Sequence, residues 1–215
     1  AQRTGATLRF LEEGVTFYPA PDGTFDYEDG DVAVRGIRPG IPGPAQVTNA
    51  ALAAAAALSC TSLSVPPEAI RAGISSARLP GRLQLLSGEP PVLVDVAHSP
   101  ASARNLALHL STLGRKPVVL IWGMARDKDA ASFVAAIGTV VDAVVATAAR
   151  HPRSAPPSDL ANIAARSIRR AKTAGDVAAG LALARDTAGP AGLVCVAGSF
   201  YVAAEALTIL TGPKE

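Results

Sequence analysis

From about residue 80 to the end of the chain, short apolar runs alternate with stretches of helical length. We predict strands at 92–96, 117–122, 141–146, near 171–173 and at 192–197, and helices at about 100–113, 129–138, 158–170, 176–187 and 201–211. The strand at 92–96 is largely a run of aliphatic and β-branched residues, which is typical of a strand buried on both faces of a parallel sheet. Strands that alternate with helices of this length form βαβ units, with helices on both faces. The sequence therefore predicts an α/β fold with a Rossmann-like, mainly parallel sheet.

The residues before this region follow a different pattern. Short alternating apolar runs occur at 7–11, 15–18, 25–27 and 32–35, and breaks such as Asp22-Gly23 and Asp29-Gly30 separate them. Asp-Gly between such runs is a hairpin signal, so we predict small antiparallel strands. A Gly/Pro-rich loop at 39–44 precedes an Ala-rich helix at about 46–59 and a second helix at 67–76. We place a boundary near residues 77–79, which divides the chain into parts 1–78 and 79–215.

Polar residues follow the first buried strand of the second part. Asp95 and His98 come at its end, and Ser99-Pro100 then begins a helix with serine as the N-cap and proline in the first turn. Ligands of α/β folds bind at this end of the strands. Asp95 suits the hydroxyls of a ribose, and His98 suits a phosphate, a carboxylate or a base. The alternative is structural: Asp95 caps the following helix, and His98 bonds to the backbone.

Two further loops also follow a predicted buried strand and precede a helix. Trp122 to Asp129 follows the second strand and carries Arg126, Asp127 and Lys128; the structural alternative is Asp129 as a helix cap with the cations in solvent. After the last strand, Gly198 permits close backbone approach and Ser199 caps the final helix. We therefore expect the three loops to share one crevice.

Composition excludes several classes of protein. The 215 residues are 49% hydrophobic and 18% charged, with a net charge of +2, which fits a globular chain without nucleic-acid or membrane partners. The uncharged span 39–67 contains prolines and polar residues and is rejected as a membrane helix. Two cysteines without metal-ligand spacing indicate a reducing, cytoplasmic location. Because the chain begins at Ala1 instead of Met, we expect a fragment or a processed chain.

Several nucleotide and catalytic motifs are absent from the sequence. There is no G-x-x-x-x-G-K-[ST] P-loop, and no G-x-G-x-x-G turn follows a strand. No Ser-His-Asp or Cys-His set emerges from the three histidines. We predict that His109, within a helix, and His151, in a Pro-rich loop, are structural or solvent-exposed.

Five motifs resemble those of the folylpolyglutamate synthase/dihydrofolate synthase family, which belongs to the Mur-type, ATP-dependent amide-bond ligases. Pro-Gly-Arg at 80–82 and Asp-Val-Ala-His-Ser-Pro at 95–100 resemble the family's P-G-R and D-G-A-H-N-P signatures. Residues 42–51, 123–129 and 198–201 are similar to its P-G-x-H-Q-x-x-N-A-A, G-x-x-x-D-K-D and G-S-x-Y/H motifs. Ala45 and Ser99 depart from the histidine and asparagine of those patterns, so contacts of that asparagine are in doubt here.

The resemblance implies a role for each matching residue. Asn49 would contact adenine, Arg82 would reach ATP, and Asp95 would bind the ribose. His98 would be catalytic, close to glutamate and nucleotide. Ser199, Tyr201 and Lys128 would bind substrate. No metal ligand is assigned.

The resemblance also implies an activity. ATP would phosphorylate a folate or dihydropteroate carboxylate, and L-glutamate would attack the acyl phosphate. Residues 1–78 would be the end of a central ATPase domain, whose missing N-terminal region carries the P-loop and most Mg²⁺ ligands. Residues 79–215 would form the C-terminal glutamate ligase domain of a monomer. The alternatives are another Mur-type ligase of cell-wall precursor synthesis and a non-catalytic nucleotide-binding or interaction module.

Overall fold

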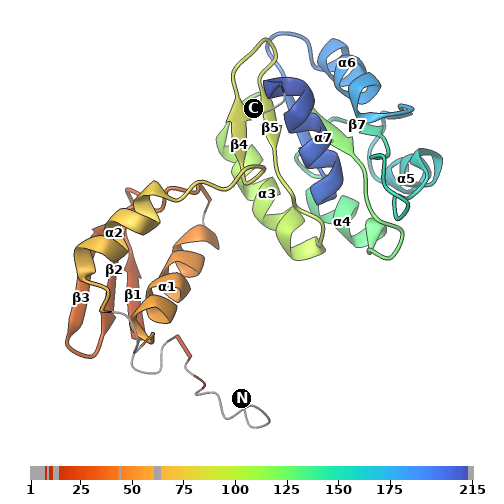
Figure 1. Cartoon of the computed structure of the whole chain (residues 1–215). Helices are drawn as coiled ribbons and strands as arrows, with labels where there is room; N and C mark the ends of the chain where they lie inside the picture. The colour runs from red at the N-terminus through yellow and green to blue at the C-terminus, as the bar shows by residue number, and fades with distance from the viewer. Residues whose placement is uncertain (1–7, 9, 12–14, 44, 61–63, 213–215) are drawn as a thin grey trace. The chain divides into compact units, whose positions relative to one another are not determined.

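The structure, a computed structural model, describes residues 8, 10–11, 15–43, 45–60 and 64–212. The chain forms two compact units, Ala1–Leu79 and Pro80–Glu215 (Figure 1). In the described part of the chain, no helix combines the length and apolar character needed to cross a membrane.

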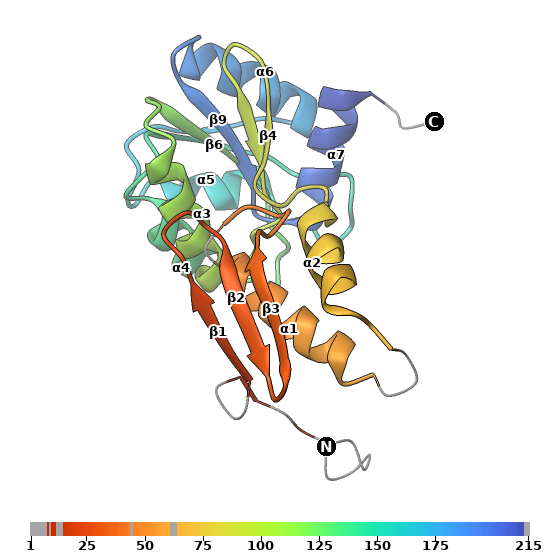
Figure 2. The same cartoon turned by 90° about the vertical axis from the view of Figure 1, so that its left-hand side faces the viewer.

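The first unit is a small antiparallel sheet covered by two helices. Its strands are β1 (Val15–Pro19), β2 (Phe25–Asp29) and β3 (Val32–Ile37), in that spatial order, and its helices are α1 (Ala45–Leu58) and α2 (Pro67–Ser76). Both helices cover the same face of the sheet, where Phe25, Tyr27 and Ile37 are fully buried against the alanines of α1 (Figure 2). The predicted hairpins are present, with Gly30 at φ +56° in the tight turn between β2 and β3. Of the predicted strand at 7–11, residues 7 and 9 lie outside the described residues, and residues 8, 10 and 11 are not in a strand.

The second unit has the predicted mainly parallel sheet. Six strands lie in the order β4-β5-β9-β6-β7-β8, and only β4, at one edge, is antiparallel to its neighbour. The strands are β4 (Gln84–Leu86), β5 (Val92–Val94), β6 (Val118–Trp122), β7 (Ala143–Ala146), β8 (Ala171–Thr173) and β9 (Leu193–Ala197). The helices are α3 (Pro100–Thr112), α4 (Ala130–Ile137), α5 (Pro157–Ala164), α6 (Val177–Ala188) and α7 (Phe200–Thr211). The last strand along the chain therefore inserts between β5 and β6.

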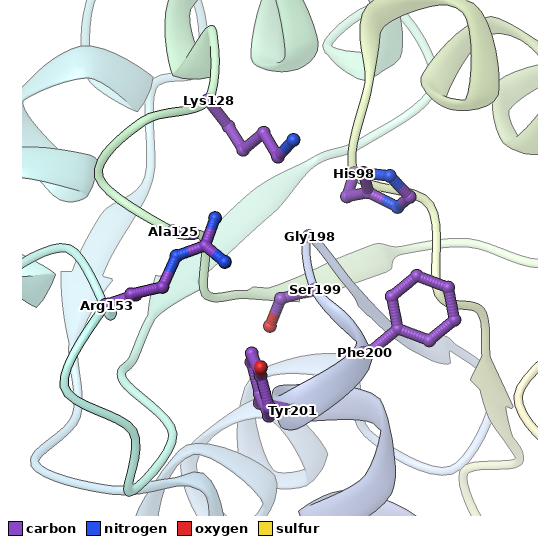
Figure 3. A pocket seen from close by; sticks show the side chains of 8 residues that line it. All are labelled: His98, Ala125, Lys128, Arg153, Gly198, Ser199, Phe200 and Tyr201. Carbon is purple, nitrogen blue, oxygen red and sulfur yellow. The ribbon is translucent and has the colours of Figure 1, made fainter.

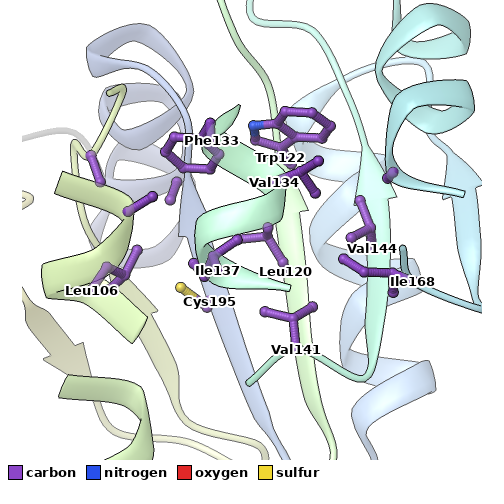
Figure 4. Close-up of a cluster of buried hydrophobic side chains, with 14 of the residues drawn as sticks. Leu106, Leu120, Trp122, Phe133, Val134, Ile137, Val141, Val144, Ile168 and Cys195 are labelled. Atoms are coloured by element: carbon purple, nitrogen blue, oxygen red, sulfur yellow. The ribbon is translucent and has the colours of Figure 1, made fainter. Parts of the chain in front are cut away.

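Alternation along the central strands builds a separate core on each face of this sheet. In β6, Leu120 and Trp122 pack with α3, α4 and α5, whereas Val119 and Ile121 pack with α6 and α7. Trp122 stacks on Phe133 of α4 with ring centroids 5.9 Å apart (Figure 4). Every residue of β6 is buried, which explains its continuous apolar sequence. The predicted helices on both faces are confirmed.

Cys195 of β9 belongs to the same core as Trp122. Burial raises the pKa of its thiol, so this side chain stays neutral and packs as an apolar group.

Several element boundaries differ from the prediction, and two of the differences follow from specific contacts. The helix predicted at 158–170 ends at Ala164, because the chain turns there to bury Ile168 and then enters β8 at Ala171. The strand predicted at 92–96 ends at Val94. The amide of Asp95 still donates to the carbonyl of Val196 in β9, but the amide of Val96 donates to Gly81 instead of continuing the ladder.

Candidate functional site

A pocket of about 300 Å³ lies at the carboxyl ends of the parallel strands (Figure 3). It is lined by His98, Ala125, Lys128, Arg153, Gly198, Ser199, Phe200 and Tyr201. These residues come from the loops that follow β5, β6, β7 and β9. Because β9 inserts between β5 and β6, the chain order reverses at this point of the sheet, and such a switch point is where open α/β sheets bind ligands. The three loops predicted to share a crevice do so.

Glycines allow the strand ends to approach closely beneath the pocket. The amide of Gly198 donates to the carbonyl of Ala97 at 2.7 Å, and the amide of Gly123 donates to Ala197 at 3.3 Å. Gly198 has φ +114°, and a Cβ atom there would lie 2.5 Å from the Gly123 carbonyl oxygen. The three loops therefore meet only because neither position carries a side chain.

Helix α7 begins at the pocket. The Ser199 hydroxyl accepts the amide N–H of Val202 at 3.1 Å, which confirms the predicted cap. Phe200 and Tyr201, the first two helical residues, remain 54% and 43% exposed although both are large and aromatic. The helix therefore presents two aromatic rings and its positive end to the pocket.

His98 both bonds to the backbone and lines the pocket, although the sequence suggested these two roles as alternatives. Its Nδ1 lies 2.9 Å from the carbonyl oxygen of Val96, so this nitrogen carries the proton of the neutral ring and donates to the carbonyl. Nε2 is then left as an acceptor. The ring also lies 5.3 Å from the ring of Phe200. His98 is thus oriented by the backbone and by an aromatic neighbour.

Two cations flank the pocket and share one carboxylate. Both oxygens of Asp127 accept from Arg153, at 2.8 and 2.9 Å, and Lys128 Nζ lies 3.9 Å from the same group. Hydrogen bonds from Arg153 lower the pKa of Asp127, so this carboxylate is ionised. One anion does not balance two cations and a helix N-terminus, and the arrangement therefore favours an anionic ligand.

Asp95 is buried and turned toward the backbone. The residue is 6% exposed, and its two carboxylate oxygens accept the amides of Leu83 at 2.9 Å and Ala97 at 2.7 Å. It does not cap α3; Ser99 does, in a capping box with Ser102. Asp95 therefore ties the turn at 80–83 to the end of β5.

Arg82 lies on the turn that Asp95 fixes. Its guanidinium carbon lies 6.0 Å from the ring centroid of Phe200, within the range of a cation–π contact. Phe200 thus contacts both Arg82 and His98. These contacts place Arg82 and Asp95 beside the pocket, although neither residue lines it.

The remaining predicted residues have local partners. Asn49 lies in the first unit, in the first turns of α1, where its amide donates to Gln46 at 3.1 Å. Asp129 caps α4 by accepting the amide of Ser132 at 2.9 Å, as its structural alternative proposed, while Lys128 reaches the pocket. Among the described residues, no group of three or more His, Cys, Asp or Glu side chains could hold a metal ion.

Sequence reasoning missed three residues at this site: Arg153, Phe200 and His151. Arg153 lines the pocket, Phe200 bridges two predicted residues, and His151 stacks on Tyr201. One signal could have found Arg153 and His151. Their loop follows a buried parallel strand, so it belongs at the same edge of the sheet as the other three.

Three comparisons relate the chain to known proteins. Residues 81–200 match the family described as Mur ligase, glutamate ligase domain. The chain is 34% identical to dihydrofolate synthase/folylpolyglutamate synthase of Escherichia coli K12, and the match covers 100% of this chain and 49% of that protein.

Solved structures are similar over almost the whole chain. One is Escherichia coli FolC in complex with DHPP and ADP, with a TM-score of 0.82, 31% identity, and coverage of 98% of this chain and 49% of that one. Another is a bifunctional folylpolyglutamate synthase/dihydrofolate synthase with Mn, AMPPNP and L-glutamate bound, with a TM-score of 0.81, 29% identity, and coverage of 98% and 49%. The chain spans about half the length of each of these relatives.

Proposed function

Because the chain belongs to the Mur ligase family, we propose that it is the C-terminal portion of a folylpolyglutamate/dihydrofolate synthase. This enzyme would use ATP to join L-glutamate to a folate or dihydropteroate carboxylate in the cytoplasm. Residues 1–78 would complete the central ATPase domain, and residues 79–215 would form the glutamate ligase domain. The observation that carries the proposal is the pocket flanked by Lys128 and Arg153 at the switch point of the sheet. It supports a small dicarboxylate as the ligand of this domain.

In the reaction, the γ-phosphoryl group of ATP is transferred to the folate carboxylate. The amine of L-glutamate then attacks the acyl carbon; the C–N bond forms, the bond to the phosphate oxygen breaks, and the amine loses a proton. His98 is suited to take this proton, because Nδ1 is occupied by the Val96 carbonyl and Nε2 is available. Acyl phosphates hydrolyse easily, so the site has to exclude water during transfer.

Glutamate recognition would rest on the charges of the pocket. Arg153 and Lys128 would each pair with a carboxylate, and the N-terminus of α7 beside Ser199 would add its positive end. Tyr201 would form the aromatic wall. Ser199 would act mainly through the helix, since its hydroxyl already accepts the amide of Val202.

Three residues of this chain would contact the nucleotide. Asn49 would contact adenine and Arg82 the phosphates or ribose. Asp95 would bind the ribose, although both of its oxygens already accept backbone amides. The family resemblance implies that most Mg²⁺ ligands belong to the N-terminal region of the longer protein, and no step is assigned to the metal.

The purified 215-residue chain should show no ligase turnover. It lacks a P-loop, so it should not position ATP for phosphoryl transfer. A coupled assay of ADP release with ATP, L-glutamate and dihydropteroate or tetrahydrofolate tests this. Folate-dependent ADP release by the chain alone would contradict the proposal that the N-terminal region is needed to position ATP.

Neutralising the pocket cations should weaken glutamate binding. Arg153→Gln and Lys128→Gln should each raise the dissociation constant for L-glutamate about tenfold, because each removes a charge-assisted hydrogen bond. An NMR titration of the purified chain measures this. Lys116→Gln is the matched control: Lys116 is also an exposed lysine beside an aspartate, Asp142, but it precedes β6 at the opposite end of the sheet. Equal losses in all three variants would argue against the pocket as the glutamate site.

A further inference from the structure

The loop at 149–154, between β7 and α5, docks on one face of helix α7. The imidazole of His151 stacks on the ring of Tyr201, with centroids 3.7 Å apart and planes inclined by 14°. One turn further along α7, the carboxylate of Glu205 accepts the amide of Arg150 at 2.6 Å. Tyr201 and Glu205 are four residues apart and therefore lie on the same helix face. Two successive loop residues thus contact two successive turns of α7.

The other side of this loop is attached to the loop after β6. The amide of Arg126 donates to the carbonyl of Arg153 at 2.9 Å, and Arg126 Nε donates to the carbonyl of Ser154 at 3.0 Å. The guanidinium of Arg153 binds Asp127. The 149–154 loop therefore bridges α7 and the β6 loop, and the pocket lies between those two elements (Figure 3).

His151 links the two sides of the bridge. Its Nδ1 accepts the amide N–H of Arg153 at 3.2 Å while its ring covers Tyr201. The same imidazole therefore contacts the backbone of the cationic pocket residue and the ring of the aromatic one. Its own side chain does not line the pocket.

We propose that His151 is a positioning residue of this pocket. By stacking on Tyr201 and accepting the amide of Arg153, it fixes the aromatic wall relative to the backbone from which Arg153 reaches the pocket. The Tyr201 side chain is 43% exposed at a helix end and Arg153 lies on a loop, so burial alone does not fix their relative positions. Its effect on L-glutamate rests on the proposed function; its effect on Tyr201 and Arg153 does not.

Three variants separate the two contacts. His151→Phe keeps an aromatic ring on Tyr201 but has no acceptor for the Arg153 amide. His151→Asn keeps an acceptor near the position of Nδ1 but removes the ring. His151→Ala removes both. None of them changes a residue that lines the pocket.

The first readout needs no ligand. The chain has three histidines, so an NMR spectrum of the imidazole groups shows three ring systems, and that of His151 should be shifted upfield by the Tyr201 ring. Tyr201→Leu should abolish this shift and leave His98 and His109 unchanged. In His151→Ala and His151→Phe, amide exchange of Arg153 should accelerate about fivefold, whereas His151→Asn should stay near wild type. An unshifted His151 ring, or Arg153 exchange that is the same in all variants, would overturn the proposal.

The second readout links the positioning to binding. His151→Ala should weaken L-glutamate binding to the chain about five- to tenfold, and each single-contact variant should recover part of that loss. If wild-type chain does not bind L-glutamate, the proposed function of the pocket fails, and His151 is judged by ring shift and amide exchange alone. If binding is present but identical in His151→Ala, His151 is not a positioning residue.

Discussion

Replacing Asp95 with alanine should lower the free energy of unfolding of the second unit by about 2 to 5 kcal/mol. The carboxylate accepts two backbone amides, those of Leu83 and Ala97, in a residue that is 6% exposed. Alanine leaves the buried amide of Ala97 and the partly buried amide of Leu83 without an acceptor, and an unpaired buried donor costs about 1 to 3 kcal/mol. Urea unfolding followed by tryptophan fluorescence measures the effect, because the single tryptophan, Trp122, lies in the core of this unit.

Asp129→Ala is the control for this experiment. That carboxylate also accepts a backbone amide, but it is exposed at the start of α4, so its loss should cost about 1 kcal/mol. Asp95→Asn retains one acceptor oxygen and should fall between the two. Equal unfolding midpoints for Asp95→Ala and Asp129→Ala would show that the buried carboxylate does not stabilise the turn at 80–83.

The same geometry changes how an effect of Asp95 on ATP would be interpreted. In the longer protein, Asp95→Ala should weaken ATP binding. Asp95 also accepts the amide of Leu83, the residue that follows Arg82. The loss could therefore arise through Arg82 as well as through a direct ribose contact. Combining Asp95→Ala with Arg82→Ala distinguishes these routes: non-additive losses indicate that Asp95 acts through the turn.

Gly198→Ala should destabilise the second unit by about 2 to 5 kcal/mol, through backbone strain and overpacking together. Gly198 has φ +114°, and an added Cβ would lie 2.5 Å from the Gly123 carbonyl oxygen and 2.7 Å from Trp122 Cδ1. The first of these neighbours is backbone and cannot move aside without separating β9 from β6. Thermal unfolding should show a midpoint about 10 °C or more below wild type.

Gly175→Ala provides the comparison for Gly198. It lies in the same unit, before α6, and an added Cβ would have no heavy atom within 4 Å. Its melting temperature should match wild type within a few degrees. Trp122 fluorescence should also change in Gly198→Ala alone, since its indole is the second neighbour. A wild-type melting temperature for Gly198→Ala would mean that the strand ends are not closely packed at this position.

The fold of the second unit could be predicted because its strands are buried on both faces. Continuous apolar runs such as Val118–Trp122 are typical of strands in the interior of an α/β fold. The spatial order of the strands could not be predicted. Nothing local to Leu193–Ala197 indicates that β9 inserts between β5 and β6, since that position depends on long-range packing. The end of α5 was also missed, because the burial of Ile168 overrides the helical pattern.

Part of the site could be predicted because ligands of α/β folds bind at the carboxyl ends of the parallel strands. His98, Lys128, Ser199 and Tyr201 line one pocket, as the three loops suggested, whereas the roles assigned to them remain proposals. The orientation of Asp95 could not be read from the sequence, because its partner Leu83 is twelve residues away in an irregular turn. The position of Arg153 does follow from the sequence, because its loop comes after the predicted strand at 141–146 and therefore belongs to the same edge of the sheet.

The alternation along β6 also constrains how this domain can change over evolutionary time. Val119 and Leu120 are joined by a peptide bond, yet they pack against different sets of helices. A mutation that enlarges Leu120 can be compensated by α4 but not by its neighbour Val119. Correlated substitutions should therefore link positions far apart in the chain and skip adjacent ones. Substitutions in the core on one face of the sheet can therefore accumulate independently of those on the other face, while the loops at the strand ends keep the geometry of the pocket.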